Sequence, residues 1–180
     1  MNTLRSSTLA ALFCALTVAF VFAQAVDSKQ TVAGAANFVC LDAKFASGGA
    51  TTPDAFATLK QLGYRTVINL RTASEPGADL EGEAKVVGQA GLRYFSLPLS
   101  PAAPDPLVVD KFLEIVKDPA NQPVYIHCLS GLRANALWMI KRVMVDGWTV
   151  EKATAEADAL KMMHPGLRDF AARYLREHVK

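Results

Sequence analysis

The sequence has no excess of charge of either sign. Its 19 Lys and Arg residues nearly balance its 17 Asp and Glu residues, which gives a formal net charge of +2. Without a basic excess, a nucleic-acid partner is not expected. Cysteine is also scarce, with 3 in 180 residues. A folded portion of roughly 150 residues buries about 68–70% of its unfolded surface, so no disulfide is needed for stability.

Clusters of metal-ligating residues are lacking as well. The 3 histidines are scattered along the chain, and no Cys and His residues have the spacing of a metal site: His127, His164 and His178. The sequence therefore predicts neither a metal nor another cofactor. Its composition, 51% hydrophobic and 20% charged, is that of an ordinary globular protein with the length for one domain.

The first 25 residues contain almost no charge. Arg5 is the only charged residue before Asp27, and residues 9–23 are almost wholly apolar. The stretch ends in Ala23-Gln24-Ala25, a small-x-small cleavage pattern. We predict a signal peptide over residues 1–25 that is removed after Ala25, which implies a periplasmic or secreted protein without stable membrane anchoring. An uncleaved anchor is the alternative, although the apolar core is shorter than the usual ~20-residue span.

Export leaves two cysteines in the mature chain, Cys40 and Cys128. An oxidising compartment permits them to pair, provided that their Cα atoms come within about 7 Å of each other. Such a disulfide would switch off a reactive Cys128 reversibly. The alternative is that Cys40 is a small buried hydrophobic residue of an early strand.

Strand and helix patterns alternate along the rest of the chain. After a flexible lead-in over residues 26–36, residues 37–180 form the predicted domain. Strands are expected over 38–45, 66–70, 92–97 and 124–127, and helices over 52–62, 81–90, 107–116, 133–146, 150–162 and 167–179. This alternation predicts a single α/β domain whose central, largely parallel sheet is flanked by helices on both faces. Ligands of such sheets bind beyond the carboxyl ends of the strands.

The most informative stretch runs from Val124 to Ala134. A short apolar strand ends at a cysteine, Cys128, and Gly131 allows a sharp turn into a helix that starts at about Arg133. Backbone N–H groups and the positive end of a helix dipole make such a loop an anion site. The same groups favour the thiolate form of a cysteine at the rim of the loop. Arg133 can add a bidentate grip on a tetrahedral oxyanion.

The residues His127-Cys128-x-x-Gly131-x-Arg133 resemble the active-site loop of cysteine-dependent phosphatases of the tyrosine and dual-specificity kind. The resemblance is strongest to a bacterial branch, the phosphatase-like domain first named for its fusion to beta-lactamase-like hydrolases. Residues 63–71, Gly-Tyr-Arg-Thr-Val-Ile-Asn-Leu-Arg, are similar to the second-strand motif of that branch. The likeness covers roughly residues 37–148.

This resemblance implies a tyrosine-phosphatase-like fold and a phosphorylated substrate, either a protein or a small molecule. Cys128 is then the nucleophile that forms a phosphocysteine, and Arg133 binds the transferred group. A general acid is expected on a loop upstream, where Asp105 is the candidate; its alternative role is to cap the next helix. The predicted anion-binding loop comprises His127, Leu129, Ser130, Gly131 and Leu132, joined by Arg71 from the end of the second strand. Arg71 can alternatively form an ion pair with Glu75.

Two features depart from the phosphatase pattern. Four residues separate Cys128 from Arg133, whereas the usual phosphatase loop has five; four is also the spacing of rhodanese sulfurtransferases, whose tighter loop holds a persulfide. Ala134 stands where phosphatases usually keep a Ser or Thr. Three functions therefore stay open: a phosphatase-like enzyme, a sulfurtransferase with a Cys128 persulfide, and a non-catalytic anion-binding module.

Overall fold

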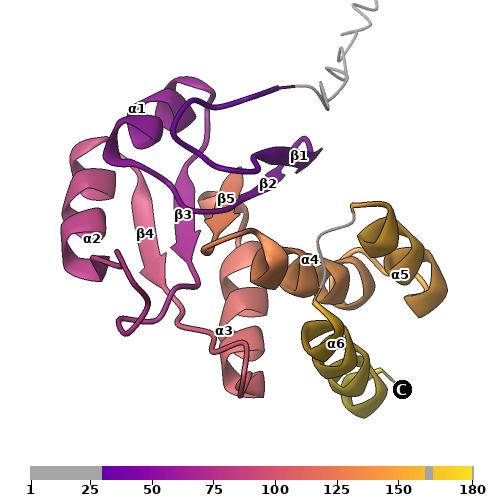
Figure 1. Ribbon diagram of the computed structural model, residues 1–180. Helices are drawn as coiled ribbons and strands as arrows, with labels where there is room; N and C mark the ends of the chain where they lie inside the picture. The colour runs from indigo at the N-terminus through magenta and orange to yellow at the C-terminus, as the bar shows by residue number, and fades with distance from the viewer. Residues whose placement is uncertain (1–29, 161–163, 180) are drawn as a thin grey trace, which may run out of the picture.

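The computed structural model describes residues 30–160 and 164–179 (Figure 1). The predicted signal peptide and its cleavage site at Ala25 lie outside the described residues. Within the described part of the chain, no helix combines the length and the apolar character that a membrane span requires. The same residues contain no group of three or more His, Cys, Asp or Glu side chains that could hold a metal ion.

A mostly parallel sheet forms the centre of the fold, as predicted. Its strands are β1 (Val39–Asp42), β2 (Phe45–Gly48), β3 (Thr66–Asn69), β4 (Arg93–Ser96) and β5 (Val124–His127). They are arranged in the order β1-β2-β5-β3-β4, and only β1 runs antiparallel to its neighbour. β5 therefore lies in the middle, and its side chains are buried because both faces of the sheet are covered.

The sequence pattern predicts one strand over 38–45 and a turn at Ser47-Gly48-Gly49 after it, and this prediction was wrong. The chain turns earlier, where the Asp42 carboxylate accepts the Lys44 N–H at 2.8 Å, and residues up to Gly48 form a second, fully buried strand. A Cβ atom at Gly48 would come within 2.3 Å of the Tyr125 hydroxyl. This glycine therefore allows close packing within a strand instead of a turn.

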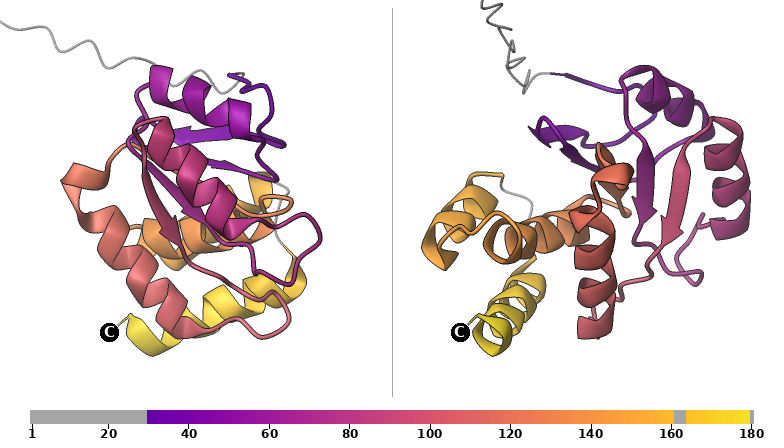
Figure 2. Two further views of the ribbon diagram at one scale, coloured as in Figure 1. Left: turned by 90° about the vertical axis from the view of Figure 1, so that its left-hand side faces the viewer. Right: turned by 180° about the vertical axis from the view of Figure 1, so that it is seen from behind.

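Helices cover both faces of the sheet (Figure 2). α1 (Pro53–Gln61) and α2 (Leu80–Gln89) pack on one face, against a cluster that includes Val67 and Tyr125. The other face, with Ile68 and Ile126, is covered by α3 (Pro106–Lys117) and α4 (Leu132–Met144), and α5 (Val150–Ala159) and α6 (Pro165–His178) pack against α4. A short 3-10 helix over Pro119–Asn121 leads into β5.

The helices match the predicted ranges to within a few residues, with one error in the core. The apolar spacing of this segment predicts that Leu62 faces the core beside Phe56 and Leu59, but Leu62 follows the last residue of α1 and is 42% exposed. The end of the helix predicted over 150–162 lies outside the described residues. The described part of that helix ends at Ala159.

Candidate active site

The predicted strand–loop–helix unit is present at the centre of the sheet. Cys128 follows β5 directly, and the loop reaches Gly131, whose φ of 95° is a left-handed conformation that favours glycine. Gly131 is the N-cap of α4. The connections that follow β2 and β3 flank this loop, because these strands pair with β5 on either side.

Cys128 lies against the N-terminus of α4. Its Sγ accepts the N–H of Gly131 at 3.1 Å, and the residue is fully buried. The first hydrogen bond along α4 joins Asn135 N–H to Gly131 C=O, so the N–H groups of the preceding residues have no partner within the helix. Ala50 N–H fixes the loop by donating to Leu129 C=O at 2.9 Å. A nucleophile and free backbone donors therefore occupy one turn.

Arg133 is buried and fixed by a carboxylate. Its Nη1 donates to Glu75 Oε1 at 2.6 Å and to the C=O groups of Leu70 and Leu99, at 3.0 and 3.1 Å. Its Nη2 donates to Glu75 Oε2 at 2.8 Å. A guanidinium has five N–H donors, so these bonds leave the Nε–H and one Nη2–H. Those two donors form a planar fork of the kind that binds an oxyanion.

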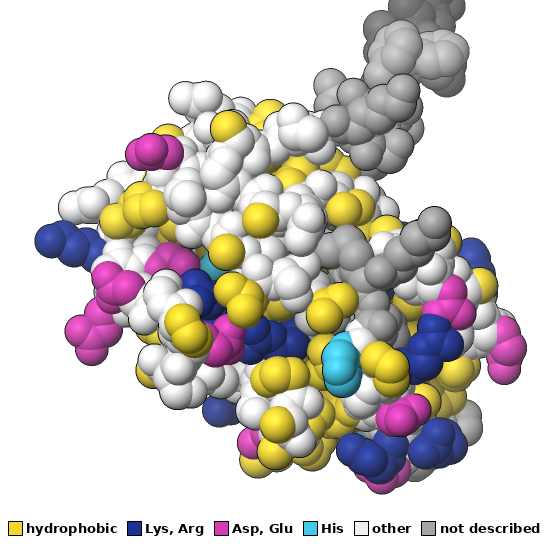
Figure 3. All heavy atoms as spheres, viewed as in Figure 1, with side chains coloured by type: hydrophobic (Ala, Val, Ile, Leu, Met, Phe, Trp, Pro, Cys, Tyr) yellow, Lys and Arg dark blue, Asp and Glu magenta, His cyan; other side chains and the backbone are white. Residues whose placement is uncertain are grey.

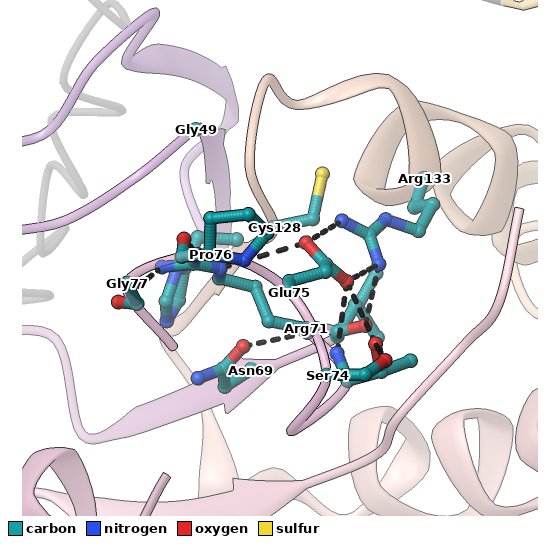
Figure 4. Close-up of polar contacts among 12 residues, drawn as sticks. Gly49, Asn69, Arg71, Ser74, Glu75, Pro76, Gly77, Cys128 and Arg133 are labelled. Carbon is teal, nitrogen blue, oxygen red and sulfur yellow. Dashed lines mark hydrogen bonds and ion pairs between the residues drawn. The ribbon is translucent and has the colours of Figure 1, made fainter. Parts of the chain in front are cut away.

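The free fork of Arg133 lies beside the cysteine. Figure 4 shows the Cys128 sulfur next to the guanidinium, while the Glu75 carboxylate lies between Arg133 and Arg71. Burial lowers the pKa of Arg133, but the hydrogen bond with Glu75 and the charges of Cys128 and Glu75 outweigh it and raise the pKa overall. Arg133 therefore stays a cation at any physiological pH. Figure 3 shows basic and acidic side chains side by side near the middle of this face.

Glu75 is the first functional residue that the sequence analysis missed, because it was paired only with Arg71. The hydrogen bond from Arg133 is the main cause that lowers the pKa of Glu75 to about 2, against the opposing effect of burial. The carboxylate therefore holds its charge and orients Arg133. No local pattern could have shown this pair, since 58 residues separate its members.

We predict that the Glu75–Arg133 ion pair makes the fold sensitive to acid. The folded-state pKa of Glu75 lies below the unfolded value of about 4.3, so its contribution to stability is complete above that value. The contribution is then lost as the pH falls toward about 2. Urea unfolding of the wild type and of Glu75→Gln should show a difference in unfolding free energy near neutral pH that shrinks through this window. A difference that stays constant with pH would contradict the assignment.

Arg71 lies at the predicted rim but is engaged by the loop that follows it. Its Nη1 donates to Gly77 C=O at 3.1 Å and its Nη2 to Pro76 C=O at 2.6 Å. Its Nε lies 3.6 Å from Glu75 Oε2, so the predicted ion pair is present. The guanidinium thus supports the β3–α2 connection. A direct anion contact of Arg71 stays a prediction.

His127 is buried beneath the loop and paired with a second missed residue, Glu83. Its Nε2 lies 2.9 Å from Glu83 Oε1, which also accepts Asn69 Nδ2–H at 2.8 Å. Its Nδ1 has no hydrogen-bond partner among the described residues. This network joins α2 to β3 and β5 and fixes the imidazole next to Cys128. The resemblance to the phosphatases implies that His127 orients the cysteine, and this role stays a prediction.

The other loop residues have simpler surroundings. The Leu129 side chain is 50% exposed at the rim, and the Ser130 C=O accepts Asn37 Nδ2–H at 3.2 Å. Leu132 begins α4. The hydroxyl of Ser130 has no hydrogen bond among the described residues that would link it to Cys128. A contact of these three residues with an anion stays a prediction.

Asp105, the predicted general acid, is exposed and caps α3. Its Oδ1 accepts the N–H of Leu107 at 2.9 Å. Among the described residues, no hydrogen bond or ion pair joins Asp105 to Cys128 or Arg133. The capping alternative is therefore present in the structure, and the catalytic role stays a prediction.

The proposed disulfide switch between Cys40 and Cys128 does not fit the strand registers. Cys40 pairs with Ala46, and Ala46 pairs with Tyr125, three residues before Cys128. Two strand spacings and three residues along the strand separate the Cα atoms by about 14 Å. That exceeds the ~7 Å limit for a disulfide, and neither cysteine forms a disulfide in the structure. The switch hypothesis was wrong.

Solved structures with the same fold are cysteine-dependent phosphatases or related proteins. A DUF442 protein from Shewanella putrefaciens CN-32 matches with a TM-score of 0.68, 22% identity, and coverage of 82% of this chain and 94% of that chain. The core catalytic domain of the PP-IP phosphatase SIW14 from S. cerevisiae matches with a TM-score of 0.65 and 20% identity, over 80% of this chain and 88% of that chain. P. aeruginosa TpbA matches with a TM-score of 0.63 and 23% identity, over 82% of this chain and 88% of that chain. The fold is therefore that of the tyrosine-phosphatase-like enzymes.

A family model described as "DSP-PTPase phosphatase fused to NAD+ Kinase" matches residues 19–173. The chain belongs to this family of cysteine-dependent phosphatase domains. It is also 31% identical over 113 residues to the beta-lactamase hydrolase-like protein of Xylella fastidiosa (strain Temecula1), a match that covers 61% of this chain. The matched region spans about a quarter of that relative, 25% of its length.

Proposed function

We propose that this protein hydrolyses phosphate monoesters through a phosphocysteine formed on Cys128. The observation that carries the proposal is the position of the sulfur. It lies at the N-terminus of α4, hydrogen-bonded to Gly131 N–H, with the free donor fork of Arg133 beside it. Helix N-termini and arginine forks both stabilise a bound phosphoryl group.

The chemistry proceeds in two displacements. The Cys128 thiolate attacks phosphorus, the P–O bond to the alcohol breaks, and the leaving oxygen takes a proton from a general acid. Water then attacks the phosphocysteine, the P–S bond breaks, and the thiolate and inorganic phosphate are released. Glu75 takes no part in bond making; it keeps the guanidinium of Arg133 oriented in both steps. Cys128 is buried in the structure, so the segments over it must move to admit the substrate.

Asp105 is the proposed general acid, and its capping bond suggests a clean test. Asn caps a helix about as well as Asp, so Asp105→Asn should leave the melting temperature nearly unchanged. If Asp105 protonates the leaving oxygen, this variant slows an alkyl phosphate by about 10²–10⁴-fold and an activated aryl phosphate much less. Comparable rates for variant and wild type on both esters would leave Asp105 with capping alone.

Sulfur transfer is the second candidate, favoured by the four-residue spacing between Cys128 and Arg133. In that reaction, the Cys128 thiolate attacks the outer sulfur of thiosulfate, the S–S bond breaks and sulfite leaves; cyanide then takes the persulfide sulfur as thiocyanate and the thiolate is regenerated. An aryl phosphate and thiosulfate plus cyanide, assayed side by side with the same preparation, separate the two activities. The proposal expects phosphate release to dominate. Thiocyanate formation without phosphate release would replace the phosphatase proposal with sulfur transfer. The absence of both products would favour a non-catalytic anion-binding module.

We also propose that the chain is exported to the periplasm or beyond, on the strength of the apolar segment and the Ala23-Gln24-Ala25 pattern. Mass spectrometry of the protein recovered from a periplasmic extract should then find Val26 at its N-terminus. An intact Met1 in a cytosolic fraction would contradict export.

A further inference from the structure

We propose that a cavity beside the cysteine loop binds the hydroxyl-rich alcohol portion, a sugar or other polyol, of the phosphate monoester. This inference rests on the proposed function and specifies its substrate class. The cavity has a volume of about 220 Å³, which is suited to a single small group. Its walls come from the β2–α1 and β3–α2 connections and the first two turns of both helices, and include Pro53, Phe56, Arg71, Asp79, Glu83 and Val86.

The cavity adjoins the reacting groups through two of its walls. Arg71 lies 3.6 Å from Glu75, and Glu75 holds Arg133. Glu83 Oε1 lies within hydrogen-bond distance, 2.9 Å, of Nε2 of His127, the residue before the cysteine. Both connections that form the cavity flank the cysteine loop, because β2 and β3 pair with β5 on either side. The proposal therefore places the alcohol portion of an ester in this cavity when its phosphoryl group sits in the loop.

The polar groups that line the cavity are mainly acceptors. Arg71 has a side chain that is only 9% exposed; its Nη groups donate to Gly77 and Pro76 C=O, and its Nε lies 3.6 Å from Glu75 Oε2. The Asp79 carboxylate uses Oδ1 to accept Gly82 N–H at 2.9 Å, which leaves Oδ2 for a ligand. Glu83 adds a second carboxylate. A hydroxyl donates to such carboxylates, so a polyhydroxylated group satisfies these acceptors better than an aromatic ring does.

The charge and the apolar lining of the cavity narrow the class of substrate further. Asp79 and Glu83 place two carboxylates around the cavity, whereas Arg71 already shares its charge with Glu75. A second phosphate group would be repelled there, so the substrate carries one phosphate. Pro53, Phe56 and Val86 supply an apolar wall that suits the C–H face of a sugar ring.

The test compares kcat/KM for glucose 6-phosphate, phenyl phosphate and fructose 1,6-bisphosphate. Val86→Phe fills the cavity from α2, and Leu107→Phe, on an exposed position of α3, is the control. We expect Val86→Phe to lower the ratio of glucose 6-phosphate to phenyl phosphate by about tenfold or more, since the site then cannot pair its polar groups. Leu107→Phe should leave the ratio unchanged. Asp79→Asn, which keeps the cap, should raise the relative rate on the bisphosphate.

Failure of this inference is distinct from failure of the proposed function. Turnover of all three esters, with a ratio that Val86→Phe leaves unchanged, overturns the cavity assignment and leaves the phosphatase proposal intact. If the wild type hydrolyses none of them, calorimetry on Cys128→Ser decides. Glucose 6-phosphate binding tighter than inorganic phosphate, with the gain lost in Val86→Phe, supports the cavity, and equal affinities overturn it.

Discussion

Replacing Cys128 with serine is expected to reduce kcat/KM for an aryl phosphate by about 10⁴-fold or more, the scale seen when a covalent nucleophile is removed. A serine hydroxyl is a far weaker nucleophile at neutral pH, and among the described residues no histidine or carboxylate is hydrogen-bonded to the Cys128 sulfur. Serine still accepts the Gly131 N–H, so the loop and the fold should persist. Phosphate release and the thermal unfolding midpoint measure the two parts of the expectation.

The matched control is Cys40→Ser, the other cysteine among the described residues. Cys40 lies on the edge strand β1, away from the loop, so its variant should keep nearly full activity. Activity of Cys128→Ser within a few-fold of the wild type would contradict covalent catalysis in either form, phosphatase or sulfurtransferase.

Arg133→Lys is expected to cost about 10²–10³-fold in kcat, the loss that follows removal of a donor that stabilises the transition state. Lysine keeps the positive charge and can still pair with Glu75. It cannot supply the Nε–H and Nη2–H fork that Arg133 keeps free beside Cys128. Single-turnover rates with an aryl phosphate separate this loss from weaker binding.

Arg142→Lys is a closely matched control, because Arg142 lies in the same helix and forms the same kind of bidentate pair. Its Nε and Nη2 each donate to the Glu156 carboxylate at 3.0 Å. This variant should lose stability without losing activity. Equal activity losses in both variants would indicate that Arg133 acts only through the stability of α4.

The local part of the site could be predicted from the sequence, because its determinants are adjacent in the chain. A buried strand, a cysteine, a turn glycine and a helix follow one another over residues 124–144, and the structure has them in that order. The parallel sheet followed from the same alternation of strands and helices. Each of these features depends on the period and composition of a short segment.

The long-range part could not be predicted. Glu75 orients Arg133 across 58 residues, and Glu83 pairs with His127 across 44. A carboxylate at either position is equally compatible with an exposed loop or helix surface until the fold is known. The turn predicted at Gly48 was wrong for the same reason: the Tyr125 ring that requires a glycine there belongs to a strand that is distant in the sequence. The Cys40–Cys128 hypothesis failed because sheet order, which no local pattern specifies, separates the two residues.

The most direct test of the account is to trap the intermediate. A wild-type sample turning over phenyl phosphate is quenched under conditions that preserve a thiophosphate ester, digested, and analysed by mass spectrometry. The account predicts one phosphoryl group on the peptide that carries Cys128, and none in Cys128→Ser. Release of phosphate with no phosphorylated Cys128 peptide would contradict the account. So would a sample treated with thiosulfate in which a persulfide on Cys128 is the sole modification that the protein forms with either substrate.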